Sequence, residues 1–409
     1  MKEREVPFPF RWGFGPDFIY DRPMKKSPLS IGWALLLLTL AANGPVSPDD
    51  GIPPPPATPP AVEPTDTPVP YVYRVPEQVP DGWRVGDLRK EKADAAPITQ
   101  GVSEIRSGKI PGMHSLLVLR HGKLLLEEYF NGFTVNSRHP LFSCTKSVFS
   151  TVYGIAQDQG LLSLDGKIAE LYPDSAQKGW GKDKADITIG SMLSMTSGLD
   201  CDDVGVGNDN CGAAMGASKD WLGFCFARPV AHPVGTFWMY NGCCLSLISN
   251  LITQKSGMSF PEFAKKVLLE PLDIPDDTWV TGPDGVNRVD YGLEWKARDM
   301  AKLGQLYLDG GKWKGKQIVS EAWVKDATSL HCKPGTAFGH SYGYLWHLKD
   351  MSFKGKTVKV FYANGYQGQA IFVSPDADLV CVMTAGSQDN LIYSMEENFF
   401  EEKLLGSFK

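Results

Sequence analysis

The chain has 409 residues, enough to bury a large hydrophobic core in one large domain or in two smaller ones. Hydrophobic residues make up 43% and charged residues 22% of the sequence, which is typical of a globular protein rather than a disordered one. The formal net charge of −6, without any block of basic residues, argues against a nucleic-acid-binding protein, which needs a positively charged face.

Residues 1–42 have the pattern of an N-terminal extension followed by an export signal. Met24, Lys25 and Lys26 precede an apolar run over residues 31–42 that ends in small residues. A charged start, an apolar middle and a small-residue end define a secretory signal peptide, and we expect translation to begin at Met24. The alternative is an N-terminal membrane anchor, although the run is short for a membrane span.

Residues 43–80 are rich in proline, with four consecutive prolines at 53–56. Such a segment buries little apolar surface and is predicted to be an extended, disordered linker. The folded domain is therefore expected over residues 81–409. Together these features predict an exported bacterial protein, periplasmic or extracellular, with no stable membrane span once it is processed.

The eight cysteines suit an oxidising compartment. Cys201 and Cys211 bracket a loop rich in glycine, aspartate and asparagine, and we expect them to form a disulfide. Cys225 with Cys243 or Cys244 is a second candidate pair. The alternative is that all eight are buried free thiols, since cysteine packs well as a small apolar residue.

A metal site or cofactor is not expected. The sequence has no C-x-x-C or H-E-x-x-H spacing, and its seven histidines are scattered. Asp200, Asp202 and Asp203 lack the spacing of a calcium-binding loop, so we interpret them as part of a solvated loop.

Periodicity predicts strands at both ends of the folded part and helices between them. A hairpin turning at Gly122 is followed by a helix from Ser143 to about residue 159 that ends at Gly160. Further helices are predicted at 189–195, 245–256, 297–308 and 390–405, and further strands at 358–362, 369–373 and 379–384. This order predicts an α+β fold, with an antiparallel sheet built from both termini, a helical subdomain, and the active site in the cleft between them.

Ser143 and Lys146 are the first candidate catalytic pair. At a helix start, positions i and i+3 share one face, so the lysine ammonium can reach the serine hydroxyl. A serine needs a neighbouring base to become a nucleophile, and a lysine can be that base only if its pKa is lowered. The adjacent Cys144 points about 100° away on a helix and is expected to pack into the core.

Two later segments hold further candidates. Tyr240 closes the sequence Gly235-Thr-Phe-Trp-Met-Tyr, and a lysine cation would stabilise its phenolate as a proton acceptor. Taken alone, it is more readily explained as a core tyrosine on an aromatic stripe with Phe237 and Trp238. The glycine-rich stretch 361–369 lets the backbone approach a ligand, and a strand edge there can supply an oxyanion-binding amide. Taken alone, it is more readily explained as a glycine-containing turn between two strands.

The order of three motifs resembles that of the class C β-lactamase superfamily. The motifs are Ser-x-x-Lys at 143–146, Gly-Thr-x-x-x-Tyr at 235–240 and the glycine-rich stretch at 361–369. That group includes penicillin-binding DD-peptidases, family VIII carboxylesterases and 6-aminohexanoate-dimer hydrolases. Residues 114–122 and 193–199 match as well, and 295–319 with 342–346 resemble the 6-aminohexanoate-hydrolase and esterase branch. The resemblance covers about residues 111–400.

The resemblance implies a role for each matching residue. Ser143 would attack the acyl carbonyl, and Lys146 and Tyr240 would share the proton transfers. The backbone amides of Ser143 and Tyr366 would bind the oxyanion. No cofactor is implied, and the partner is a small ester or amide substrate.

Two departures from the family pattern bear on the substrate. Where β-lactamases carry Tyr-x-Asn, this chain has Gly242, so Asn241 is the candidate amide next to the substrate. Where relatives carry Lys-Thr-Gly or His-Thr-Gly, this chain has Ala363, Asn364 and Gly365, and it lacks the cation that pairs with a substrate carboxylate.

We therefore expect a serine hydrolase that cleaves neutral carboxylic esters or linear amides through an acyl-enzyme on Ser143. The alternatives are a penicillin-recognising β-lactamase or DD-peptidase, and a slowly acylating sensor or non-catalytic binding relative.

Overall fold

The computed structural model describes residues 70–174, 179–204, 210–275, 278–334 and 340–408. The predicted signal peptide, and the linker as far as residue 69, lie outside the described residues. The last part of the predicted linker, residues 70–80, packs on the folded domain rather than extending from it. The Tyr71 hydroxyl donates to Glu128 (2.7 Å) and the Tyr73 hydroxyl to the Leu125 carbonyl (2.8 Å). The ordered domain thus begins before residue 81, because these two tyrosines bind the edge of the sheet.

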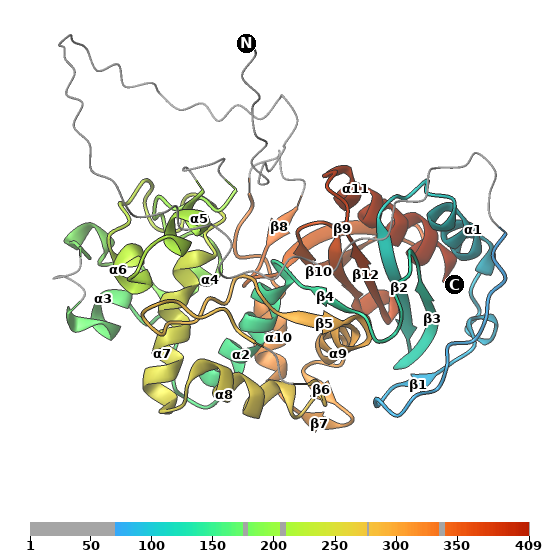
Figure 1. The fold of residues 1–409 in the computed structure, drawn as a ribbon, viewed down its shortest axis with the longest axis horizontal. Coiled ribbons are helices and arrows are strands. Elements are labelled where there is room, and N and C mark those ends of the chain that lie inside the picture. The colour runs from blue at the N-terminus through green and yellow to red at the C-terminus, as the bar shows by residue number, and fades with distance from the viewer. Residues whose placement is uncertain (1–69, 175–178, 205–209, 276–277, 335–339, 409) are drawn as a thin grey trace, which may run out of the picture.

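An eight-stranded sheet forms the centre of the domain (Figure 1). The sheet joins the two ends of the chain through the antiparallel pair β2–β12, in which Val118 lies opposite Cys381. All neighbouring strands are antiparallel except β1 and β3, which are parallel. In spatial order the strands are β1 (Arg84–Val85), β3 (Lys123–Tyr129), β2 (Met113–Arg120), β12 (Leu379–Ala385), β11 (Gln369–Ser374), β10 (Lys356–Gly365), β9 (His347–Phe353) and β8 (Ser341–Tyr342).

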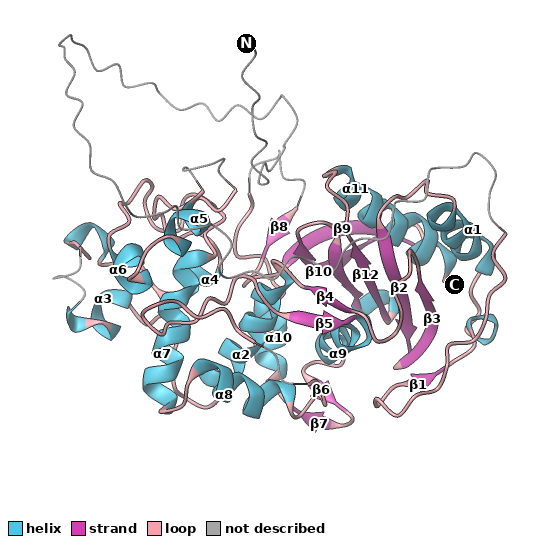
Figure 2. Cartoon of the chain, in the orientation of Figure 1, coloured by secondary structure: helices cyan, strands magenta, loops and turns pink. Residues whose placement is uncertain are grey.

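The sheet is buried on both faces. Along β2, Leu117 and Leu119 pack into one hydrophobic core, whereas Leu116 and Val118 pack into another on the opposite face. This explains why the strand is apolar at successive positions instead of alternating with polar residues. Helix α9 (Ala297–Leu308) covers the first face, and α1 (Ala95–Arg106) with α11 (Leu391–Asn398) covers the second (Figure 2).

The remaining helices lie mainly beside the sheet and form the helical part of the domain (Figure 1). They are α2 (Cys144–Asp158), α3 (Ile168–Leu171), α4 (Ile189–Leu193), α5 (Cys211–Gly216), α6 (Trp221–Phe226), α7 (Ser246–Ser256), α8 (Phe260–Ala264) and α10 (Glu321–Ala327). Short 3₁₀ helices span Leu88–Lys90, Lys182–Lys184, Cys243–Leu245, Pro375–Ala377 and Leu405–Ser407, and π-helical turns span Lys265–Leu269 and Phe399–Leu404. Two small antiparallel pairs complete the fold: β4 (Arg138–Pro140) with β5 (Glu294–Lys296), and β6 (Lys312–Trp313) with β7 (Lys316–Gln317).

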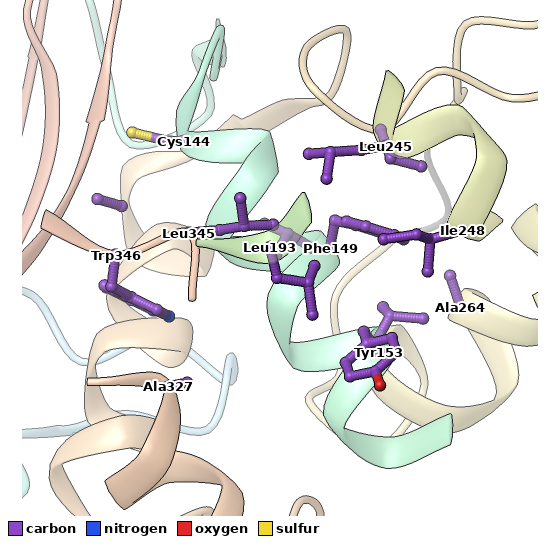
Figure 3. Packing of buried hydrophobic residues seen from close by; sticks show 14 of the residues in the cluster. Cys144, Phe149, Tyr153, Leu193, Leu245, Ile248, Ala264, Ala327, Leu345 and Trp346 are labelled. Atoms are coloured by element: carbon purple, nitrogen blue, oxygen red, sulfur yellow. The ribbon is translucent and has the colours of Figure 1, made fainter. Parts of the chain in front are cut away.

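Helix α2 lies between the sheet and the helical part, and its residues from Cys144 to Ala156 are all buried. Figure 3 shows how it packs on both sides: Cys144 points toward the strands, whereas Phe149 points toward Ile248 of α7. A helix that is buried all round cannot shift without disrupting packing on several sides. The start of α2 is therefore a rigid position for reactive side chains.

The predicted α+β fold is confirmed, and the predicted strands and helices match the observed elements to within a few residues. The elements that the sequence did not predict include α1 and β9, which carry polar residues among their apolar ones, and short elements such as α6 and α10. Among the described residues, no helix combines the length and the apolar character that a bilayer span requires.

Candidate active site

Ser143 occupies the N-cap of α2, and its hydroxyl makes no capping hydrogen bond to the helix backbone. The Lys146 ammonium donates to that hydroxyl, with Nζ 3.1 Å from Oγ. The preceding residue, Phe142, has a φ of 45°, a left-handed conformation that costs a non-glycine residue of the order of 1 kcal/mol or more. The turn thus directs the Ser143 hydroxyl toward Lys146 and leaves it free of a capping hydrogen bond to the helix backbone.

Lys146 is almost completely buried, and its ammonium has partners from three other segments. Nζ donates to the Asp290 carbonyl (3.0 Å) and lies 4.6 Å from the centre of the Tyr240 ring. Burial alone would lower the pKa of Lys146, but the neighbouring Tyr240, Asp290 and Asp203 outweigh it and raise the pKa above its ordinary value. At neutral pH the resting side chain is therefore a cation.

Gly242 stands where β-lactamases have the asparagine of Tyr-x-Asn, and the structure leaves no room for a side chain there. A β-carbon on Gly242 would lie 2.5 Å from Lys146 Cε and 2.7 Å from Asp290 Cβ. Asp203 closes this side of the site instead. Its carboxylate accepts from the Gly242 amide (2.5 Å), and its own amide donates to the Tyr240 carbonyl (2.9 Å).

Asp203, Asp290 and Arg288 form a buried charge cluster behind Lys146. Arg288 donates twice to the Asp290 carboxylate, from Nε at 2.9 Å and from Nη2 at 2.5 Å. Burial opposes ionisation of Asp290, but the Arg288 charge and hydrogen bonds keep its pKa below the usual range. Burial and the Asp290 charge raise the pKa of Asp203 to about 6.

The interpretation of Asp203 as part of a solvated loop is wrong, because its side chain turns inward to Gly242. The sequence reading did not identify Asp290 or Arg288 either. The only signal for them was Arg288-Val-Asp290 in an otherwise apolar stretch, where two opposite charges flank a buried valine.

The end of β10 lies against the start of α2. A β-carbon on Gly365 would come within 2.3 Å of the Leu141 carbonyl, so only glycine allows this approach. The Tyr366 ring meets Phe142 edge to face, with centroids 5.5 Å apart. Cys144 is not a second nucleophile: its thiol is buried and donates to the Gln369 carbonyl (3.3 Å). The predicted packing of Cys144 into the core is confirmed.

The remaining predicted binding residues have different surroundings. Ala363 is fully buried, whereas Asn364 is half-buried on β10. Asn241 is buried, and its carbonyl oxygen accepts from the Cys244 amide (3.3 Å), while its Nδ2 has no partner. The structure brings Ser143, Lys146, Tyr240 and Gly242 together. The side-chain oxygen of Asn241 points instead toward the 3₁₀ helix that begins at Cys243.

Behind Gly242 lies a cluster of sulfur atoms. Cys201 and Cys211 are at disulfide-bonding distance, as the sequence predicted. Cys225, Cys243 and Cys244 are free thiols, so the predicted second bridge does not form. The Cys225 thiol instead contacts the Met215 sulfur (3.7 Å) and the Cys243 carbonyl (3.8 Å).

A hollow of about 660 Å³ opens elsewhere, between residues 70–79 and the side chains of Arg106, Glu128, Phe133 and Arg298. None of the candidate catalytic residues lines it. We therefore place the candidate site by the chemistry around Ser143 and not by this hollow.

Comparison with known proteins agrees with this site and fold. The Beta-lactamase family model matches residues 89–392 of the chain. The chain is 23% identical over 293 residues to the 6-aminohexanoate-dimer hydrolase of Paenarthrobacter ureafaciens, covering 67% of this chain and 73% of that protein.

Two solved structures have a similar fold. One is the octameric penicillin-binding protein homologue from Pyrococcus abyssi, with a TM-score of 0.56, 18% identity, and coverage of 76% of this chain and 78% of that one. The other is a family VIII carboxylesterase, with a TM-score of 0.54, 17% identity, and coverage of 70% of this chain and 90% of that one. Because the family match spans well over half of the sequence, the chain belongs to the Beta-lactamase family of hydrolases.

Proposed function

We propose that the protein is a serine hydrolase that cleaves neutral carboxylic esters or linear amides through an acyl-enzyme on Ser143. The observation that carries the proposal is the contact of Lys146 Nζ with both the Ser143 hydroxyl and the Tyr240 ring. A nucleophile, a buried cation and a second proton-transfer group at one point are the parts that acyl transfer needs.

The raised pKa of Lys146 divides the proton work between the two groups. A lysine that stays protonated cannot accept the Ser143 proton in the resting enzyme, but its charge stabilises a phenolate beside it. Tyr240 is therefore the acceptor during acylation. The Lys146 ammonium holds the Ser143 oxygen in place and gives its proton to the departing leaving group, and Tyr240 passes the proton taken from Ser143 back to Lys146, which restores the resting state.

The oxyanion of the tetrahedral intermediate would bind to the amides of Ser143 and Tyr366. Gly365 supports this assignment, since it brings the end of β10 against the turn that holds Ser143. Loss of one such donor typically costs about 3 kcal/mol of transition-state stabilisation.

The neutral charge of the proposed substrate follows from Ala363. A carboxylated β-lactam or D-alanyl peptide is bound by a cation at this position in relatives that carry one, and Ala363 offers none. The family relatives named as a 6-aminohexanoate-dimer hydrolase and a carboxylesterase support amide and ester bonds as the substrate class.

A fluorophosphonate probe and a panel of p-nitrophenyl esters, linear amides and nitrocefin test the proposal. We expect labelling of the wild type, steady turnover of a short-chain ester, and loss of both in Ser143→Ala, with a rate drop on the order of a millionfold. The matched control, Cys144→Ala, should retain labelling and turnover because Cys144 packs into the core.

Other outcomes separate the alternatives. Nitrocefin turnover equal to that of the best ester would indicate a β-lactamase, and labelling without turnover would indicate a sensor. Ester turnover that survives in Ser143→Ala would refute Ser143 as the nucleophile.

A further inference from the structure

The sulfur cluster behind Gly242 contains more donors than one disulfide uses. Cys243 Sγ lies 2.9 Å from Cys201 Sγ and 3.5 Å from Cys211 Sγ. Cys244 Sγ lies 3.8 Å from Cys201 Sγ. Three segments supply these sulfurs: the loop after α4, the first residue of α5, and the 3₁₀ helix Cys243–Leu245.

A carboxylate completes the group. One ligand atom from each of Cys201, Cys211, Cys243 and Asp203 can be chosen so that all four lie within 4.8 Å of one another. Asp203 Oδ1 is buried and has no hydrogen-bond partner among the described residues, while Oδ2 is held by the Gly242 amide. A buried carboxylate oxygen without a partner is costly, and a cation would satisfy it.

We propose that the reduced cluster is a binding site for a thiophilic divalent cation such as Zn²⁺, with Cys201, Cys211, Cys243 and Asp203 as its four ligands. Zinc prefers four tetrahedral ligands of the thiolate, imidazole or carboxylate type. With metal–sulfur distances near 2.3 Å, tetrahedral ligand atoms lie about 3.5–3.8 Å apart, so small side-chain shifts would form the site.

The same two cysteines cannot be bridged and act as thiolate ligands at once. An external dithiol reduces the Cys201–Cys211 bridge to two thiols and is itself oxidised to a disulfide. Binding of the cation then releases the protons of the three thiols. The site therefore has two exclusive forms, a disulfide in oxidising surroundings and a metal site in reducing ones.

The ligands are too far apart in sequence for a spacing motif to reveal them. Cys201 and Cys211 are separated by ten positions and Cys243 follows 32 residues after Cys211. The expectation that the chain lacks a metal site rested on motifs, whereas this group is assembled by the packing of three segments.

Cobalt titration tests the proposal, since cobalt–thiolate bonds absorb in the near ultraviolet and tetrahedral Co²⁺ has intense visible bands. The full chain is prepared in a reducing cytoplasm, kept with a dithiol and titrated with Co²⁺, then with Zn²⁺ as competitor. We expect one tightly bound Co²⁺ per chain, displaced by Zn²⁺. The oxidised protein, with its disulfide intact, should show no charge-transfer band.

Variants identify the ligands. Cys243→Ser should weaken Co²⁺ binding by at least about a hundredfold and Asp203→Asn by at least about tenfold, because loss of even an outer-shell partner of a metal site typically costs about 10- to 100-fold in affinity. Cys381→Ser removes a buried thiol of the other core and should bind like the wild type. Binding unchanged in Cys243→Ser, or no band in folded reduced protein, would overturn the proposal.

Circular dichroism decides the case in which reduction affects folding. A reduced chain that folds only after Zn²⁺ is added supports the site, because the metal then supplies folding energy. A reduced chain that stays unfolded with Zn²⁺ present overturns it.

Discussion

The two sides of Ser143 handle buried titratable groups in opposite ways. On the helical side, Asp290 is ionised and paired with Arg288, and Lys146 is a buried cation. On the sheet side, His114 of β2 and His139 of β4 are buried, with pKa values lowered by burial to about 3 and about 4, and are neutral at neutral pH. The helical side thus keeps charged groups beside Ser143, whereas burial keeps these two histidines of the sheet side uncharged.

Removal of the Lys146 charge is the largest test of this division. Lys146→Met keeps most of the buried length but removes the cation that Ser143, Tyr240 and Asp203 face. We expect kcat to fall by about 10²- to 10⁴-fold, the usual contribution of a positioned proton-transfer group. Steady-state ester hydrolysis measures it.

The matched control is Lys302→Met, which removes another buried lysine, paired with Asp299 and distant in sequence from the site. Its kcat per folded molecule should stay near that of the wild type. Equal losses in the two variants would mean that Lys146 matters for folding alone.

Gly242→Asn restores the asparagine of the Tyr-x-Asn motif. It tests whether the Asp203–Gly242 contact replaces that asparagine or whether the asparagine has simply been lost. In Gly242→Asn the new β-carbon meets Lys146 Cε and Asp290 Cβ well inside contact distance. Lys146 must move, and a displacement of about 1 Å in a catalytic group costs on the order of a hundredfold in rate. Ester kinetics with nitrocefin as a second substrate measure the change.

Gly216→Asn is the control, because nothing lies within 4 Å of a β-carbon there. If Gly242→Asn instead retained ester turnover and gained β-lactam turnover, the glycine would be a simple loss from the ancestral site. That result would mean that Asp203 does not take the place of the asparagine side chain in this site.

The sequence predicted the local parts of the site better than the parts made by loop packing, for a physical reason. Ser143 and Lys146 are three residues apart at one helix start, so their contact follows from local geometry. Gly365 belongs to a glycine-rich segment between two predicted strands, which the sequence shows directly. The Asp203–Gly242 and Lys146–Asp290 contacts depend on how loops pack on the helices, and no period or spacing encodes that packing.

The same reason explains the errors over the cysteine-rich loop. Its composition predicted solvent exposure, which is correct for many Asp- and Gly-rich loops. In this fold, however, the Asp203 amide binds the Tyr240 carbonyl and pulls the side chain inward. A single tertiary hydrogen bond overrides the composition of its loop.

The neutral histidines of the sheet side predict a specific loss of stability in acid. In the unfolded chain both titrate near 6.5, whereas in the folded chain their pKa values are about 3 and about 4. Between about pH 4 and pH 6.5 the unfolded state binds up to two more protons than the folded state. The contribution of these histidines to folding stability is therefore complete above about pH 6.5 and is lost as the pH falls. The slope reaches about 2.7 kcal/mol per pH unit from this pair.

Urea unfolding at several pH values measures this slope. His139→Gln should reduce it by about half, because one of the two titrating groups is gone. His121→Gln, which removes an exposed histidine from the neighbouring hairpin, is the control. An unchanged slope in His139→Gln would show that burial does not keep His139 neutral in the folded protein.

Glu396 gives the smallest and sharpest test of the comparison, since it is a buried carboxyl group on the sheet side with no ionic partner among the described residues. It is 1% exposed, neither of its oxygens has a partner, and a β-carbon on Gly368 would lie 2.9 Å from Oε1. Burial raises its pKa well above the ordinary value, so the folded state keeps a proton that the unfolded state releases above about pH 4.3. This group therefore reduces folding stability as the pH rises, the opposite sign from the histidines.

In Glu396→Gln the side chain is neutral at every pH, and we expect its stability relative to the wild type to improve by at least about 1 kcal/mol between pH 5 and pH 8. Glu402→Gln, an exposed neighbour, should show no such trend. A flat difference for Glu396→Gln would mean that Glu396 is ionised in the fold although its carboxylate has no ionic partner there.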